Sequence, residues 1–96
     1  MPEFGNPFSG VSNPKKLSEA ELIRAIRFLI SAEYEAIQLY AQVAEATDNK
    51  LAIDVLIDIA NEERVHAGEF LQLLHQLAPD EAKFYKKGKD EVNKMM

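Results

Sequence analysis

The sequence has no cysteine among its 96 residues. A chain without cysteine forms neither a disulfide framework nor a thiolate metal site, so a reducing compartment suits it. No apolar run reaches the roughly 18 residues that a membrane-spanning helix needs, and the N-terminus lacks the charged and apolar pattern of a signal peptide. We therefore expect a cytoplasmic protein of one small domain, with no membrane contact.

Basic residues are scarce in the middle of the chain. Residues 17–78 hold eleven acidic side chains and four basic ones, whereas the two flanking segments each carry one net positive charge. An acidic segment of this kind argues against nucleic acid as a partner and is compatible with attracting cations. A solvated acidic surface that binds nothing is the more common alternative.

Glycine and proline are rare outside the N-terminal segment, residues 1–16, which holds five of the eight. We expect this segment to be an irregular arm. Ser18 and Glu21 then stand three residues apart before an apolar-periodic run, which is the pattern of a capping box. They predict a helix that continues to about Ala46.

A turn-like cluster, Thr47-Asp48-Asn49, ends this run, and Thr47 or Asp48 is the expected cap of a second helix. The second helix is predicted to reach about Ala78, where Pro79 stops it and opens a shorter helical segment. The chain is therefore expected to divide into an arm (1–16), a helical hairpin (17–78) and a C-terminal helical segment (79–96).

A seven-residue repeat of apolar residues runs along both long helices, as expected for an antiparallel pair or bundle. The rows on the first helix are Ile26-Glu33-Tyr40 and Ile23-Ile30-Ile37-Ala44, and those on the second are Leu56-Glu63-Phe70-Leu77 and Ala52-Ile59-His66-Leu73. The predicted fold class is all-α, an antiparallel two-helix hairpin with a short C-terminal helix. Two helices leave an apolar stripe uncovered, so we expect a second hairpin to cover it and complete a four-helix bundle.

Three polar residues, Glu33, Glu63 and His66, interrupt rows that are otherwise apolar or aromatic. A buried carboxylate that is neither paired nor metal-bound costs several kcal/mol. Glu33 and Glu63 each stand fifteen residues from a turn centred on Asp48, so antiparallel helices place both about 22 Å from the turn. His66 follows Glu63 by three residues and shares its face. The three side chains are therefore predicted to meet.

Two carboxylates and an imidazole form a ligand set that suits iron or manganese. Ferritin-like di-iron bundles use one Glu from each of two helices and a Glu-x-x-His from each of two others. One chain supplies half of this set, so two copies would complete a di-iron site, and ferroxidase activity is the leading hypothesis. A lone Glu-x-x-His arises often on exposed surfaces, and a single core His is more often a packing residue. The alternative is a non-catalytic helical metal-binding or assembly module.

Residues near these three have more open roles. Tyr40 stands one heptad beyond Glu33 and could hydrogen-bond a ligand or handle a radical, although a packed core tyrosine explains it equally well. Tyr34 and Glu35 flank the site and are candidates to line its opening. His75 has no acidic partner in register and is expected to be structural or at the surface. Three further acids fall off the rows and are expected to face solvent: Glu35, Glu62 and Glu69.

The segments Glu-Tyr-Glu-Ala-Ile-Gln-Leu-Tyr and Asn-Glu-Glu-Arg-Val-His, within residues 32–77, resemble the encapsulated ferritins. These are short, rubrerythrin-related ferritin-like proteins whose two-helix monomer is half of a four-helix ferritin fold. The resemblance implies that two subunits hold a di-iron ferroxidase centre across their interface. It also implies a ring of dimers, typically a decamer, and an encapsulin shell as a partner that would enclose the ring for iron storage or detoxification.

The resemblance assigns roles to five residues. The ligand glutamate of the first helix in this family falls on Glu33, and its Glu-x-x-His falls on Glu63 and His66. The tyrosine near the iron falls on Tyr40. An acid two residues after the first ligand falls on Glu35, where the family has a site for incoming metal.

The sequence departs from the family pattern in three places. Ala32 stands where members often carry an acid, and Leu39 replaces a common tryptophan. Both changes concern the site for incoming metal and leave the ferroxidase ligands intact. Residues 93–96 do not resemble the hydrophobic and basic tag that directs cargo into an encapsulin shell, a difference that a longer native protein would explain.

Overall fold

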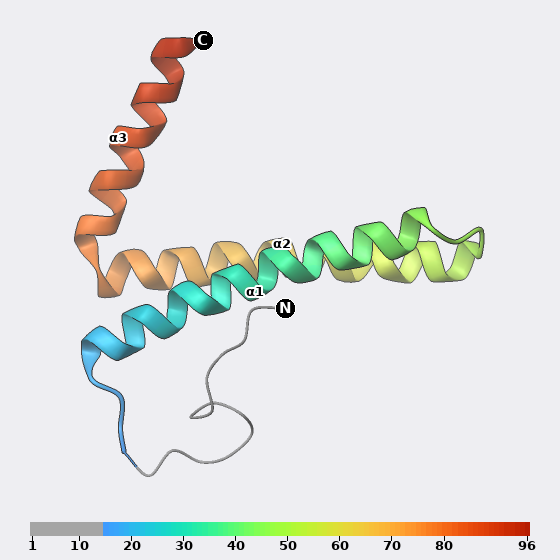
Figure 1. Cartoon of the computed structure of the whole chain (residues 1–96), viewed down its shortest axis with the longest axis horizontal. Helices are drawn as coiled ribbons and strands as arrows, with labels where there is room; N and C mark the ends of the chain where they lie inside the picture. The colour runs from blue at the N-terminus through green and yellow to red at the C-terminus, as the bar shows by residue number, and fades with distance from the viewer. Residues whose placement is uncertain (1–14) are drawn as a thin grey trace.

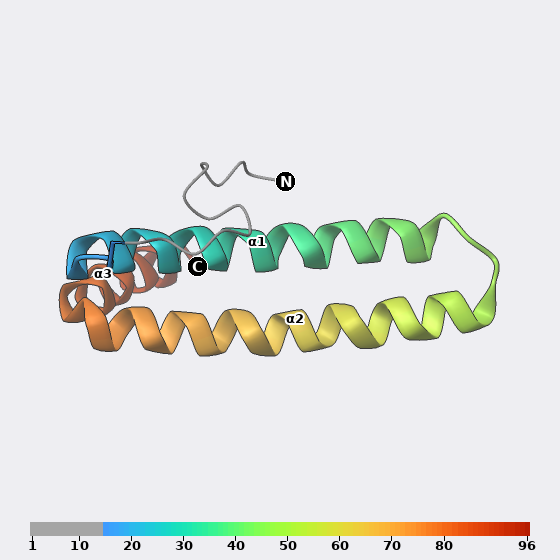
Figure 2. The ribbon, with the colours of Figure 1, turned by 90° about the horizontal axis from the view of Figure 1, so that it is seen from below.

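Three α-helices make up the part of the chain that the computed structural model describes, residues 15–96. Helices α1 (Glu19–Glu45) and α2 (Lys50–Leu77) run antiparallel side by side, as Figure 2 shows. Helix α3 (Pro79–Met95) turns away from them at the open end of the hairpin (Figure 1). The prediction of an all-α fold, with a hairpin and a C-terminal helix, is confirmed. Most of the predicted arm, residues 1–14, lies outside the described residues.

Side-chain caps define where the two long helices begin. The Ser18 hydroxyl accepts a hydrogen bond from the Glu21 amide at 3.2 Å, and the Glu21 carboxylate accepts one from the Ser18 amide at 2.8 Å. The predicted capping box is therefore present. The cap of α2 is Asn49, whose side-chain oxygen accepts from the Ala52 amide at 3.0 Å. The expectation that Thr47 or Asp48 would cap this helix is wrong.

A small apolar core joins the hairpin near its open end. Ile26 and Ile30 of α1 and Leu74 of α2 are buried together. Farther along the hairpin the buried residues are alanines: Ala44, Ala60 and Ala67. Alanine adds little volume, so the two helix backbones can approach each other along most of their contact.

Helix α2 presents to α1 a row that was not predicted, beside the predicted row of Phe70 and Leu77, which packs against the core. The buried positions are Ala60, Ala67 and Leu74, whereas His66 is exposed and Leu73 is 42% exposed. These rows differ by one residue, which is a rotation of about 100° around a helix. The small alanine row lies at the contact because it lets the helices pack closely, so the predicted row of His66 and Leu73 lies on the flank of the hairpin.

Large apolar side chains remain exposed on the hairpin. Leu51 is 73% exposed and Val65 is 63% exposed. Others with substantial exposure are Phe28, Leu29, Leu39, Val43, Val55, Ile57 and Leu73. Apolar surface in this quantity on a small protein indicates an interaction site. Within residues 15–96, no helix has the length and apolarity that crossing a bilayer demands.

Helix α3 is attached through a polar junction. Arg27 of α1 donates to the carboxylate of Glu81 at 2.5 Å, and this guanidinium holds the pKa of Glu81 below its usual range. Tyr85 lies edge-on to His75 of α2, with ring centroids 5.2 Å apart. Burial, followed by the contact with Glu81, raises the pKa of the Tyr85 hydroxyl. His75 therefore has a structural place, and the direction of α3 depends on these four residues.

We expect Arg27→Ala to loosen α3 while the hairpin stays folded. Exposed ion pairs contribute little, so amide hydrogen exchange in the first turns of α3 should accelerate by about two- to fivefold. Because the pKa of Glu81 is lowered, its contact with Arg27 should hold α3 in place at pH values above the usual pKa of a carboxyl. The contact should be lost as the pH falls through the lowered pKa of Glu81. Arg24→Ala is the matched control, since Arg24 is exposed on the same helix. Unchanged exchange in Arg27→Ala would contradict this role.

Candidate metal centre

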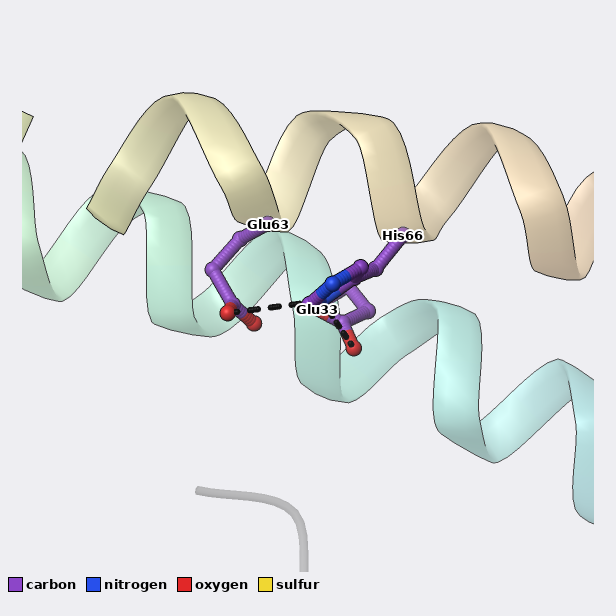
Figure 3. A group of neighbouring side chains, drawn as sticks. All are labelled: Glu33, Glu63 and His66. Carbon is purple, nitrogen blue, oxygen red and sulfur yellow. Dashed lines mark ion pairs between the residues drawn. The ribbon is translucent and has the colours of Figure 1, made fainter. Parts of the chain in front are cut away.

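The three polar residues that interrupt the apolar rows meet at the middle of the hairpin (Figure 3). Glu33 projects from α1, and Glu63 and His66 project from neighbouring turns of α2. One ligand atom from each side chain lies within 4.8 Å of the other two. The equal distances of these residues from the turn predicted this meeting, and the antiparallel pairing of α1 with α2 produces it.

The distances between these groups leave space for a cation. His66 Nδ1 lies 3.5 Å from Glu63 Oε1 and 3.8 Å from Glu33 Oε1, too far for strong hydrogen bonds. Metal–ligand bonds to such donors are about 2 Å long, so ligand atoms at these separations can share one ion. The side chains of Glu33 and Glu63 are 15% and 20% exposed, while that of His66 is 48% exposed. The cluster therefore has two sheltered acids and one open side at the imidazole.

Glu33 is the member of the group whose ionisation is disfavoured by its surroundings. Burial raises the pKa of its carboxyl, the neighbouring Glu63 raises it further, and His66 opposes the rise. Its Oε2 atom is buried and has no hydrogen-bond partner among the described residues. A proton or a cation would stabilise a carboxyl in this position by offsetting its negative charge. The residues present thus fit a divalent metal ion.

A hollow of about 270 Å³ opens beside the cluster, lined by Glu33, His66, Glu69 and Phe70. Glu69 falls off the apolar rows and was expected to face solvent away from the site. It is exposed, but it also forms part of the wall of this hollow. The sequence contains a signal for this position of Glu69. Glu69 follows His66 by the same three residues that separate His66 from Glu63, so the three side chains lie near one another along one side of the helix.

The other candidate residues lie farther from the cluster or outside the hollow. Tyr40 is half-buried on α1, two turns from Glu33 toward the hairpin turn, and its role stays a prediction. Glu35 was expected to face solvent, but it is half-buried and makes an interaction of its own. Neither Glu35 nor Tyr34 is part of the hollow's lining. Glu62 is exposed, as expected.

Comparison with known proteins places this arrangement in a family. Residues 22–94 match the family model described as Rubrerythrin. The encapsulin nanocompartment cargo protein EncC of Myxococcus xanthus is 44% identical over 82 residues, which are 85% of this chain and 62% of that protein. A ferritin-like–encapsulin shell fusion protein of Pyrococcus furiosus is 35% identical over 85 residues, which are 88% of this chain and 25% of the fusion. The chain therefore spans less than two thirds of the length of either relative.

A solved structure extends the likeness to three dimensions. The crystal structure of the encapsulated ferritin domain from Pyrococcus furiosus matches with a TM-score of 0.88 and 32% identity. The match covers 98% of this chain and 96% of that domain, so all three helices take part in it. On the sequence match and the shared fold together, this chain belongs to the rubrerythrin family and has the fold of an encapsulated ferritin domain.

Proposed function

We propose that this protein is a ferroxidase that oxidises Fe(II) to Fe(III) at a di-iron carboxylate site completed by two copies of the chain. The observation that carries the proposal is the convergence of Glu33, Glu63 and His66 within 4.8 Å at the middle of the hairpin. Carboxylate and imidazole donors together suit iron. Rubrerythrin-type ferritin-like domains generally bind iron, which supports iron over other metals.

A second copy is needed because one chain has half of the ligands. Ferritin-like di-iron sites use four carboxylates and two histidines, and this chain contributes two and one. The apolar residues exposed on the hairpin, such as Leu73 in the same row as His66, support a partner against this hairpin. We propose that the partner contributes the same three residues around a two-fold axis and completes a four-helix bundle.

The chemistry requires a site that holds two ferrous ions close together. Each ion loses one electron, and dioxygen accepts the pair together with two protons to leave as hydrogen peroxide. The carboxylates of Glu33 and Glu63 stabilise the charge that rises on oxidation, and His66 holds a position open to solvent on one side. Tyr40 is proposed to hydrogen-bond a ligand or to supply an electron from two turns away.

A larger assembly is proposed from the relatives. One relative is named an encapsulin cargo protein and another is a fusion to an encapsulin shell. By this likeness, we propose that the protein works inside an encapsulin nanocompartment, handling or detoxifying iron. From the family resemblance of the sequence, we also propose that its dimers join into a ring of about ten chains. Helix α3 projects from the hairpin and exposes Phe84 and Met95, so it is available to contact a neighbouring dimer.

We expect Glu63→Ala and His66→Ala to lose metal binding and ferroxidase activity while they remain helical. Loss of a direct ligand should weaken Fe(II) or Co(II) binding by more than about 100-fold, because even outer partners of metal ligands contribute 10–100-fold. Anaerobic titration measures binding, and ferric absorbance in air measures oxidation.

Glu62→Ala is the matched control, since Glu62 is the exposed acid next to Glu63. It should keep most of the activity. If both ligand variants bound and oxidised iron like the parent, the site would lie elsewhere. A parent that binds metal in this cluster and never oxidises iron would instead be a non-catalytic metal-binding or assembly module.

We also expect metal and association to strengthen each other. A ligand that binds only the assembled state stabilises that state by mass action, by about 2.7 kcal/mol at a hundredfold excess over its dissociation constant. Sedimentation with and without a redox-inert ion should show the parent shifting toward the dimer or larger species when metal is added. His66→Ala should not respond to the ion. A monomer with full activity would rule out the shared site.

A further inference from the structure

The hollow beside the three proposed metal ligands is lined partly by residues that are not ligands. Two of its lining residues, Glu33 and His66, belong to the proposed ligands. The other two, Glu69 and Phe70, follow on α2 one turn beyond His66. The hollow therefore leads from the surface at Glu69 to the proposed ligands.

We propose that Glu69 is the carboxylate that receives ferrous iron from solvent and passes it to the cluster of Glu33, Glu63 and His66. This role rests on the proposed ferroxidase function, and it replaces Glu35, to which the family resemblance assigned the incoming metal. Glu35 is outside the lining of the hollow and already has an interaction of its own. Glu69 lines the hollow, and its side chain has no ion pair or hydrogen bond within residues 15–96.

The residues that line the hollow differ in whether they provide an oxygen atom that can bind a cation. Phe70 packs against the core formed by Ile26, Ile30 and Leu74, so this part of the wall is fixed and provides no donor atom. Glu69 is exposed and supplies the acidic oxygen nearest to solvent. Side chains three residues apart on a helix have Cβ atoms about 5–6 Å apart, so an ion held by Glu69 is one short step from His66.

Such a step matters because the proposed ligands are sheltered. A hydrated divalent ion approaching Glu33 and Glu63, whose side chains are 15% and 20% exposed, must lose water before either acid can bind it. An exposed carboxylate at the mouth of the hollow replaces part of the hydration shell first. Its negative charge also raises the local concentration of cations. Glu69 should therefore control how fast metal arrives, whereas the three proposed ligands determine how much is bound.

The test compares Glu69→Gln with Glu62→Gln in the full chain. Both changes remove one negative charge from an exposed position on α2, but Glu62 lies outside the lining of the hollow. Stopped-flow mixing with Co(II), which air does not oxidise at such sites, measures the association rate and the final stoichiometry by the cobalt absorption band. Fe(II) oxidation at limiting and saturating iron then separates KM from kcat.

We expect Glu69→Gln to slow Co(II) association and to raise KM for iron by about three- to tenfold, with the stoichiometry unchanged and kcat within about twofold. Glu69→Asp should recover most of the association rate, and Glu62→Gln should behave like the parent. Equal rates for Glu69→Gln and Glu62→Gln would overturn the inference, as would a lost stoichiometry in Glu69→Gln, which would make Glu69 a ligand. A parent that binds no Co(II) and oxidises no iron would overturn the proposed function itself, which is a different result.

Discussion

The proposed site depends on the carboxyl of Glu33, whose side chain is 15% exposed and lies beside the acid of Glu63. Two carboxylates held at one level of the hairpin repel each other, and a cation between them would offset that repulsion. Burial and the neighbouring acid both raise the pKa of Glu33, and one of its oxygens lacks a partner among the described residues. A divalent ion would neutralise the two neighbouring acids. The alanines of α2 let the helices approach closely, which keeps the two acids together.

The same arrangement links the site to assembly. His66 is half exposed at the open side of the cluster, and large apolar residues are exposed on the hairpin. A second hairpin would bury apolar surface and supply the missing ligands in one step, so neither gain is available without the other.

Much of this could be predicted from the sequence, because it depends on local spacing. The capping box at Ser18, the scarcity of glycine and proline, and the heptad rows predict the helices, and equal distances from the turn place Glu33 opposite Glu63. The most buried row of α2, which holds Ala60, Ala67 and Leu74, was missed because rows of large apolar residues resemble a core more than a row with two alanines does. The direction of α3 was also missed, since it depends on a pair 54 residues apart, Arg27 and Glu81.

The charge on Glu33 can be tested directly by measuring unfolding of the parent and of Glu33→Gln across pH, with and without Co(II). Because the pKa of Glu33 is raised, the stability that this carboxyl contributes to the metal-free parent should be fully present below the usual carboxyl range and be lost as the pH rises through the raised pKa. Glu33→Gln should be more stable than the metal-free parent at neutral pH and should gain nothing from Co(II), while the parent gains markedly. A Glu33→Gln variant that is less stable without metal and is still stabilised by Co(II) would contradict the account.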